Sequence, residues 1–549
     1  MERSFSDFRM GMEILKLCMG KGFLLDKEML DLFSSLTPIG IEKVVNVISS
    51  LGINERVITK SIFLKHFERF RDIISIDSEG TNIDVDDFFK GTGYLKEKSD
   101  ESDSISKEVE SLGAKVKLIS APAFTQKKIE VKDFVKHFRS RYEKIRAMLE
   151  EKNFENLSSL GKIGDNRGNY TVIVSVMGKR VTKNKNLFIE VEDMTGTSIV
   201  LINQNKKDVF SKGREILLDD VLAFSVSGTK DMLFANDLFY PEASLAEKRY
   251  GKTDEYIAFI SDIHVGSNQF LEKNLLKFVK WLNGGEGDAR QRELALKVRY
   301  LFMTGDNVDG VSVYPGQDKA LEIKDMKGQY EKLVEIIKLI RTDVKIIMCP
   351  GQHDAVWVGE PQPIIGDYWA PGLYKMKNLT LVPNPAVVEI NSGFKVLMYH
   401  GASMHAIIEW IEDIRLNHGH DNPTRVTREM LKRRHLAPMH GLCDYIPCED
   451  DPMVIDIIPD IVITGDQHRS EISMYNNILM ISSSCFQSKT PFEEKVGNNP
   501  DPCKVPLFNL KTREIKMLDF SDGVEDSLEI DNTFIELEDE IEIESENEQ

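Results

Sequence analysis

Cysteines are few in this sequence and long apolar runs are missing, and each of these features excludes a class of protein. The six cysteines among 549 residues form no CxxC pair and no disulfide-like framework, which favours a reduced, cytoplasmic protein. No stretch approaches the roughly 18 apolar residues of a membrane span, and the N-terminal segment lacks the apolar core of a signal peptide. The chain also has no nucleotide-binding P-loop. We therefore expect a soluble globular protein without a membrane partner.

Basic residues are missing from one end of the chain. Residues 521–549 hold thirteen Asp or Glu and no Lys or Arg, so this tail supplies most of the net charge of −19 and the rest carries about −6. A mildly acidic body does not exclude DNA, because DNA binding needs a local basic groove rather than a basic total. The tail alternates Ile or Leu with Glu, and we expect it to be disordered, with an edge strand on a partner as the alternative.

The length and the residue patterns predict two or three domains. Short segments with apolar residues three or four apart fill residues 1–75 and predict a small helical interaction module. We expect a linker over 76–129, since residues 96–111 are polar and charged and have almost nothing to bury. From 130 to 245 a leading helix precedes about five short strands rich in β-branched residues, which predicts an OB-fold barrel.

Two segments are rich in cations. Lys179, Arg180, Lys183 and Lys185 stand close together between the first two strands of the predicted barrel. We expect this loop to contact DNA phosphates, and a solvated hairpin is the alternative. The basic tract 425–435 is either a DNA or subunit contact or the solvated face of an amphipathic helix.

Residues 250–520 alternate apolar strands with helices, which is an α/β pattern. Five times, a run of four or five apolar residues leads into a cluster of Asp, His or amide side chains. These clusters contain Asp262 and His264; Asp306 and Asp309; Gln352, His353 and Asp354; His400; and Asp466 and His468. Because loops that leave the carboxyl ends of buried strands meet at one edge of a sheet, we expect these side chains to converge.

The chemistry of these clusters points to divalent metal ions. Oxygen and imidazole donors without cysteine suit Mn²⁺, Fe or Zn²⁺. Two such ions about 3.5–4 Å apart can clamp a phosphate and activate a water molecule, and an aspartate can bridge them with its two oxygens. One DxH or GD pair alone is more often a helix cap or a turn. Five such clusters in order, each behind a strand, predict a two-metal phosphoesterase.

The order DxH, GDxxD, Gln352-His353-Asp354, His400 and GDxH resembles the signature of the calcineurin-like metallophosphoesterases over roughly residues 254–510. Longer segments narrow the resemblance to the small subunits of archaeal D-family DNA polymerases: 308–317, 350–363, 431–441 and 486–506. The resemblance implies a two-sheet sandwich with helices outside, preceded by the barrel and the helical module. It also implies a metal-dependent 3′–5′ exonuclease for proofreading, which binds DNA and a large catalytic polymerase subunit. A catalytically inactive scaffold subunit is the alternative.

Carried over residue by residue, the resemblance implies a role for each clustered side chain. The first metal would be held by Asp262, His264 and His468, with Asp306 bridging, and the second by Gln352, His400 and Asp466. His353 would contact the phosphate and assist the leaving group, with Asp354 as its orienting partner.

Two of these positions depart from the family pattern. Gln352 stands in place of the usual Asn, and Asp466 in place of the first His of the family's GHxH. Both residues still offer a ligand oxygen, so we expect a working but retuned second site. An added carboxylate favours Mn²⁺ or Mg²⁺ over Zn²⁺ there.

Aromatic and histidine residues outside the clusters have less specific interpretations. Trp357 and Tyr368 follow the third cluster and either stack on a nucleotide base or pack in the core. The remaining histidines of this region are expected to be ordinary loop or helix residues: His405, His418, His420 and His440.

Overall fold

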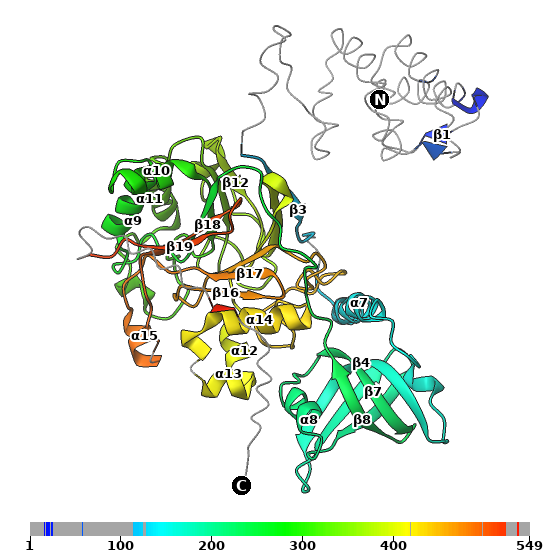
Figure 1. The fold of residues 1–549 in the computed structure, drawn as a ribbon. Coiled ribbons are helices and arrows are strands. Elements are labelled where there is room, and N and C mark those ends of the chain that lie inside the picture. The colour runs from blue at the N-terminus through cyan, green and yellow to red at the C-terminus, as the bar shows by residue number, and fades with distance from the viewer. Residues whose placement is uncertain are drawn as a thin grey trace, which may run out of the picture. The chain divides into compact units, whose positions relative to one another are not determined.

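The computed structural model divides into two compact units, residues 1–110 and 111–549 (Figure 1). It describes residues 114–124, 128–417, 419–496, 498–522 and 535–536, together with residues 16, 18–21, 24–25, 45 and 57–58 of the first unit. In that unit, β1 (Leu24–Leu25) pairs in parallel with β2 (Val57–Ile58). The helical module predicted for residues 1–75 lies largely outside the described residues.

A closed five-stranded barrel forms the first part of the larger unit. Its strands run in the order β4-β5-β6-β8-β7, and α8 (Lys207–Arg214) connects β6 to β7. The strands are β4 (Gly168–Val181), β5 (Leu187–Asp193), β6 (Gly196–Ile202), β7 (Val221–Thr229) and β8 (Met232–Phe239). Alternate residues such as Leu187, Ile189 and Val191 point into the barrel core, as the period-two pattern of a half-buried strand requires. The predicted barrel of about five strands is confirmed.

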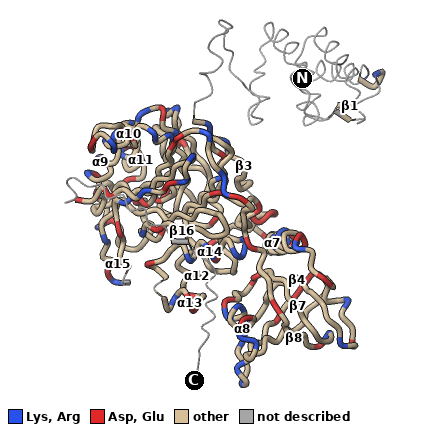
Figure 2. The backbone as a smooth tube through the Cα atoms, in the orientation of Figure 1, with Lys and Arg blue, Asp and Glu red and all other residues tan. Residues whose placement is uncertain are grey.

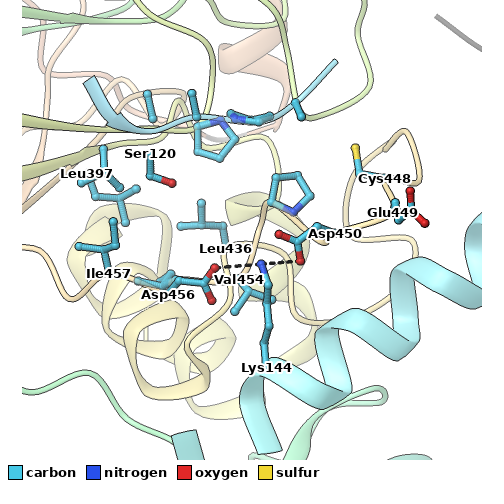
Figure 3. A pocket seen from close by; sticks show the side chains of 18 residues that line it. Ser120, Lys144, Leu397, Leu436, Cys448, Glu449, Asp450, Val454, Asp456 and Ile457 are labelled. Atoms are coloured by element: carbon cyan, nitrogen blue, oxygen red, sulfur yellow. Dashed lines mark hydrogen bonds and ion pairs between the residues drawn. The ribbon is translucent and has the colours of Figure 1, made fainter. Parts of the chain in front are cut away.

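The predicted leading helix is α7 (Val131–Glu150), and it contacts both the barrel and the α/β domain. Tyr142, Ile145 and Leu149 pack on the outside of the barrel. Lys144 contacts the carboxylates of Asp450 and Asp456 at 2.8 and 2.9 Å, across a cavity of about 510 Å³ between α7, the loop 448–457 and residues 120–123 (Figure 3). The helix α7 therefore packs against both the barrel and the α/β domain.

The first sheet of the α/β domain has the order β12-β11-β10-β9-β18-β19. Strands β9 to β12 are parallel, and β18 runs antiparallel to β9. The strands are β9 (Tyr256–Ile260), β10 (Val298–Thr304), β11 (Lys345–Cys349), β12 (Leu379–Leu381), β18 (Lys504–Asn509) and β19 (Ile515–Asp519). Three helices cover its outer face: α9 (Glu272–Leu282), α10 (Ala289–Lys297) and α11 (Met326–Ile337).

The second sheet has the order β20-β16-β17-β15-β14-β13-β3. Its strands are β3 (Val116–Ser120), β13 (Ala386–Ile390), β14 (Lys395–Met398), β15 (Ile461–Thr464), β16 (Glu471–Tyr475), β17 (Ile478–Ser482) and β20 (Ile535–Glu536). The helices α12 (Met404–Trp410), α13 (Glu412–Leu416) and α14 (Pro423–Arg433) pack on its outer face. The short helix α15 (Pro491–Val496) follows β17 in the chain.

The two sheets pack face to face with the helices outside. Phe259 and Phe302 of the first sheet and Val396 and Ile463 of the second lie in the core between the sheets. The alternate residues of the first sheet, such as Leu301, face its helices. Both faces of the central strands are thus buried, which explains their continuous apolar runs. Each fully buried side chain of this kind stabilises the fold by about 1.5–3 kcal/mol. The predicted mixed α/β arrangement of two sheets is confirmed.

Two segments, one in the predicted linker and one in the acidic tail, differ from the sequence-based expectation. Part of the predicted linker 76–129 is a strand, because β3 pairs antiparallel with β13 at the edge of the second sheet. In the acidic tail, β20 pairs in parallel with β16 at the other edge of that sheet, so these two residues add to a sheet of their own chain rather than to a partner. The rest of the tail beyond 522 lies outside the described residues.

Most of the basic tract 425–435 lies in α14, and its last residues connect this helix to the barrel. Arg433 donates to Asp220 of the barrel at 3.0 Å and to Glu429, and Lys432 contacts Glu215 at 2.5 Å. Arg433 is fully buried, and its guanidinium lies 5.1 Å from the ring of Tyr240. The last turn of this helix is therefore an internal connection rather than a solvated face. In the part of the chain that the structure describes, no helix is long and apolar enough to cross a membrane.

Candidate metal centre

The strand ends of both sheets bring the predicted side chains together. Asp262 follows β9, Asp306 follows β10, His400 follows β14 and His468 follows β15. Three overlapping groups have ligand atoms within 4.8 Å of one another: Asp262, His264 and His468; His264, Asp306 and His353; and Asp262, Asp306 and His400. Four of these residues are buried, and His353 and His468 are partly exposed. The predicted convergence of the loops is confirmed for these six residues.

The backbone is strained at this meeting point. Asp262, His264, Asp306, Asp466 and His468 have φ values between 46° and 65°, a region that residues with a side chain rarely occupy. Such conformations each cost about 1–3 kcal/mol and persist only where the surrounding structure enforces them. Their concentration at one spot marks a functional site.

Two glycines let the clusters approach closely. A Cβ atom at Gly351 would lie 2.2 Å from Oδ1 of Asp306, and one at Gly305 would lie 2.2 Å from Nδ1 of His400. Gly305 also has a φ of +82°. Any side chain at either position would displace Asp306 or His400, so glycine is needed for the geometry of the site.

His264 and His468 point their Nε2 atoms at one place beside Asp262. These two Nε2 atoms are 3.3 Å apart, and that of His468 is 3.4 Å from Oδ1 of Asp262. Their Nδ1 atoms are held from behind, by Asp309 at 3.1 Å and by Glu493 at 2.9 Å. A carboxylate behind each imidazole fixes its orientation and leaves Nε2 as the ligand atom, as in many metal sites.

His400 and Asp306 form a second, deeper pair. The Nδ1 atom of His400 lies 2.9 Å from the Thr304 carbonyl, and Nε2 lies 3.3 Å from Oδ2 of Asp306. That Nε2 atom is fully buried and has no hydrogen-bond partner of good geometry in the described part of the chain. A buried ring nitrogen without a partner beside a buried carboxylate fits a cation ligand.

The charges of this pair depend on each other. Burial disfavours ionisation of Asp306, yet the imidazoles of His400 and His353 hold its pKa well below the usual range. Burial likewise disfavours a charged His400, but the Asp306 carboxylate raises its pKa well above the usual value. A divalent cation would replace the proton held by the His400 imidazole, so metal binding at this site should release a proton.

His353 has the most exposed imidazole of the three groups, with 22% of its side-chain surface accessible against 13% for His468. Its Nδ1 atom lies 2.6 Å from the Asp309 carbonyl and its Nε2 atom lies 4.0 Å from Oδ2 of Asp306. Its backbone N–H donates to Oδ1 of Asp306 at 2.9 Å. The ring is therefore fixed at the rim of the site with Nε2 turned toward it, where a substrate could reach it.

Asp354 does not orient His353, so the predicted pairing of these two residues is wrong. Oδ2 of Asp354 accepts hydrogen bonds from the backbone N–H groups of Gly351 and Asn307 and from the Asn307 side chain, at 2.9 to 3.1 Å. Oδ1 accepts from Tyr330 at 2.8 Å. Both oxygens are used to hold two loops together, and the Asp309 carbonyl takes the place beside His353.

Gln352 and Asp466, the two unusual residues of the predicted second metal site, do not belong to the three groups of clustered ligand atoms. Asp466 belongs to none of the three groups; its Oδ1 is 3.9 Å from Nε2 of His400, and its Oδ2 is 3.4 Å from Nε2 of His405. In the described structure, Gln352 is half-buried and makes no side-chain hydrogen bond. His405, predicted to be an ordinary histidine, is thus a direct neighbour of the site.

Sequence reasoning gave no role to the residues that support the ligands. Asp309 was visible in the GDxxD spacing, but its position behind His264 depends on contacts from Gln317 and Gln487 at 3.0 and 3.1 Å. Glu493 lies 25 positions after His468 in the chain, at the start of α15, and no spacing rule points to it.

The four predicted DNA-binding cations have different environments. Lys179 donates to the carbonyls of Arg214 and Ile216 at the end of α8, and burial lowers its pKa to about 8, so it is not available for phosphate. The guanidinium of Arg180 lies 3.8 Å from the ring of Phe188. Lys183 and Lys185 are exposed in the turn between β4 and β5. Several Lys and Arg positions lie along the backbone around α8 (Figure 2).

Comparisons with known proteins give consistent similarities. The chain is 37% identical over 400 residues to the DNA polymerase II small subunit of Methanothermobacter thermautotrophicus, covering 71% of this chain and 80% of that protein. It is 37% identical over 380 residues to the DNA polymerase II small subunit of Archaeoglobus fulgidus, covering 69% of this chain and 75% of that one. A family model for the B subunits of DNA polymerases alpha and epsilon matches residues 257–473.

Similarity to solved structures is weaker. Wild-type Vps29 from Entamoeba histolytica, crystallised with zinc, is 14% identical, covers 51% of this chain and 98% of its own, and gives a TM-score of 0.26. A score this low supports no conclusion about the fold or the site.

Proposed function

The chain belongs to the family of DNA polymerase II small subunits, and from this premise we propose that its α/β domain is a calcineurin-like, metal-dependent 3′–5′ exonuclease. It would remove mismatched nucleotides for a large catalytic polymerase subunit in the cytoplasm. The observation that supports this most is the convergence of two buried aspartates with four imidazoles at the ends of strands from both sheets. Structural polar clusters rarely leave a buried imidazole nitrogen such as Nε2 of His400 without a hydrogen bond of good geometry.

The donor set fits two divalent ions. Asp262, His264 and His468 would hold one ion, His400 the other, and Asp306 both; Gln352 and Asp466 would complete the second set. When bound, such ions polarise a phosphodiester and activate a water molecule. Carboxylate and imidazole donors without thiolate suit Mn²⁺ best, with Mg²⁺, Fe or Zn²⁺ as alternatives.

His353 is the residue best placed to act on the leaving group. The Asp309 carbonyl holds its Nδ1 atom in the N–H form, so only a protonated ring can donate from Nε2. Because Nε2 faces the site from the rim, this proton could pass to the 3′ oxygen that departs from the cleaved phosphodiester.

The barrel would guide the DNA. Its strand order and the helix between its third and fourth strands suit an OB-type barrel, a fold that often binds oligonucleotides. Within the cation-rich loop, exposed Lys183 and Lys185 remain suited to phosphate contacts, and Arg180 lies beside them. The helical module proposed for residues 1–75 would contact partner proteins.

The test is excision of a mismatched 3′ end by the full chain, alone and with its large subunit, in the presence of Mn²⁺. We expect the wild type to release mononucleotides and His353→Ala to slow release by about 10²–10⁴-fold, the usual contribution of general acid–base catalysis. Asp306→Asn should also slow release, because it removes the carboxylate proposed to hold both ions. The exposed His440→Gln is the matched control and should keep full activity. An intact, Mn²⁺-loaded complex that leaves mismatched ends uncut would refute the exonuclease.

One observation favours the alternative of an inactive scaffold subunit. Asp466 shares its carboxylate with His405 and stands outside the three ligand groups, so the second ion has fewer well-placed ligands than the first. Under this alternative the large subunit would gain stability or activity from the chain, and Asp306→Asn would change neither.

A further inference from the structure

The loop after the second ligand cluster forms a hollow beside His353. The hollow has a volume of about 410 Å³, within the range of about 300–1,000 Å³ typical of small-molecule sites. Its lining comes from one stretch of chain: Val311, Ser312, Val313, Tyr314, Pro315, Gly316, Gln317, Asp318, Leu321 and Lys324. None of the residues of the three ligand groups lines the hollow, so it is distinct from the candidate metal centre.

This loop is firmly attached to the metal centre. The buried Gln317 side chain accepts from the Val313 N–H at 2.8 Å and donates to the carbonyl and to the carboxylate of Asp309 at 2.8 and 3.0 Å. Gly310 exchanges two hydrogen bonds with Gln329, at 2.9 and 3.0 Å. A Cβ atom at Gly310 would lie 2.4 Å from the His353 carbonyl, so the loop packs directly on the backbone of His353.

Tyr314 stands exposed between the hollow and the catalytic imidazole. Its residue surface is 44% exposed, and the ring centroid lies 6.5 Å from that of His353 at an interplanar angle of 59°. Val313, beside it, is 38% exposed. An apolar ring left open on a braced loop is available to stack on a ligand, since ordering it costs little conformational entropy.

The charges of the lining indicate the kind of ligand. The hollow contains one acidic residue, Asp318, and one basic residue, Lys324, so it does not attract a phosphate group as a cluster of cations would. A planar, uncharged group with polar edges suits such a lining. A nucleobase has these properties, and its face stacks on aromatic rings whatever its identity.

We propose that this hollow receives the base of the 3′-terminal nucleotide, stacked on Tyr314, while the adjoining phosphodiester lies against His353. The inference rests on the proposed nuclease function for the substrate class. It makes Tyr314 a positioning residue, which acts by placing the phosphodiester rather than by taking part in bond breaking.

The other candidates for base stacking are already occupied. Trp357 donates to the Pro361 carbonyl at 2.7 Å, and its ring packs against Phe124 at 5.7 Å. The ring of Tyr368 is covered by Nζ of Lys327 at 3.8 Å. Tyr368 is exposed and aromatic like Tyr314 and thus provides a matched control.

Equilibrium binding tests the hollow without requiring catalysis. The full chain with Mn²⁺ is titrated with a deoxynucleoside 5′-monophosphate and with deoxyribose 5-phosphate, which lacks the base. We expect the wild type and Tyr314→Phe to prefer the nucleotide by about tenfold or more, the size of one aromatic–base stack. Tyr314→Ala should lose most of this preference, and Tyr368→Ala should keep it. A Tyr314→Ala variant that keeps the preference, or loses affinity for both compounds equally, overturns the proposal.

Excision then separates this proposal from the proposed function. The substrates are oligonucleotides that end in a normal or an abasic 3′ residue. Tyr314→Ala should raise KM for the normal end about tenfold and leave the abasic end nearly unchanged; an equal effect on both ends overturns the proposal. If the wild type cuts neither end, the nuclease function fails, while the binding preference still decides the role of the hollow.

Discussion

At the scale of single residues, His353 and Asp354 are neighbours with different roles. His353 presents one ring nitrogen to the metal centre, whereas both oxygens of Asp354 hold backbone and side-chain donors of two other loops. Burial and the Asp306 carboxylate raise the pKa of Asp354, and its hydrogen-bond donors oppose this shift. The aspartate therefore shapes the site through Gly351 and Asn307.

This difference predicts that alanine at these two adjacent positions lowers the free energy of unfolding by different amounts. Asp354→Ala leaves the N–H groups of Gly351 and Asn307 buried without an acceptor, at about 1–3 kcal/mol each, so we expect a loss of unfolding free energy of about 3 kcal/mol. His353→Ala should lower it by less than about 1 kcal/mol, since its ring is at the rim. Urea unfolding followed by fluorescence of the buried Trp281 measures both. Equal unfolding midpoints for Asp354→Ala and the wild type would contradict the assignment, and Asp354→Asn should recover part of the loss.

Spacing along the chain predicted which side chains cluster at the site but not the residues that hold them in place. The residues of the three ligand groups each follow an apolar run directly, so their convergence follows from strand direction. The positions of Glu493 and His405 depend on how α15 and α12 pack, and no local pattern encodes that. Lys179 was expected in a cation-rich loop, yet it lies in β4 and donates to the end of α8, a contact between residues 35 positions apart.

At the scale of elements, the buried carboxylate of Asp451 in the α/β domain is one of the contacts that hold α7. Oδ2 of Asp451 contacts Arg141 at 2.8 Å and His137 at 3.2 Å from α7, and His435 at 3.0 Å. The Nδ1 atom of His435 accepts from the Ala437 N–H at 3.0 Å, so protonating this nitrogen would break a hydrogen bond. Burial, together with Arg141, lowers the pKa of His435 to about 4.

This contact predicts acid sensitivity of the docked helix. The pKa of His435 is about 4 in the folded chain and about 6.5 in an unfolded one. Between these values the unfolded chain binds more protons, so stability is complete above about pH 6.5 and falls as the pH drops toward 4, by at most about 1.4 kcal/mol per pH unit. Burial also lowers the pKa of His137, which acts in the same direction.

Urea midpoints measured from pH 7.5 to 4.5 check this prediction. His435→Gln should show a shallower loss of stability with falling pH than the wild type, even if it is less stable at pH 7.5. The exposed His440→Gln should follow the wild type. Parallel pH profiles for His435→Gln and the wild type would exclude His435 as the sensor.

Elements with both faces buried were the ones that the sequence predicted well. The apolar runs of these sheet strands are continuous. The five barrel strands were also predicted, because apolar residues recur at alternate positions along them and face the barrel core. β3 was missed because its five residues are mostly exposed and their partner, β13, lies about 270 positions later in the chain. The sequence did not decide between the two interpretations of the basic tract 425–435, because Asp220, the ion-pair partner of Arg433, lies in a different domain.

At the scale of the whole molecule, the side chains of the proposed metal centre come from both sheets, so ion binding there would be coupled to folding. Asp262 and Asp306 belong to the first sheet, and His400 and His468 to the second. An ion that binds only this arrangement stabilises the folded chain by RT ln(1 + [ion]/Kd), about 2.7 kcal/mol at a hundredfold excess over Kd. Removing metal with a chelator should therefore lower the melting temperature of the full chain.

Counting ions distinguishes the nuclease from the scaffold. We expect two Mn²⁺ per chain at saturation, with the second bound more weakly because Asp466 is shared with His405. Asp262→Asn should remove the tight ion and Asp466→Ala the weak one, while Asp466→His should shift the second site toward Zn²⁺, which accepts imidazole more readily. Electron paramagnetic resonance of free Mn²⁺ during titration gives both constants. A single ion at saturation, unchanged in Asp466→Ala, would instead mean that the second site is not formed and that the chain acts as a scaffold.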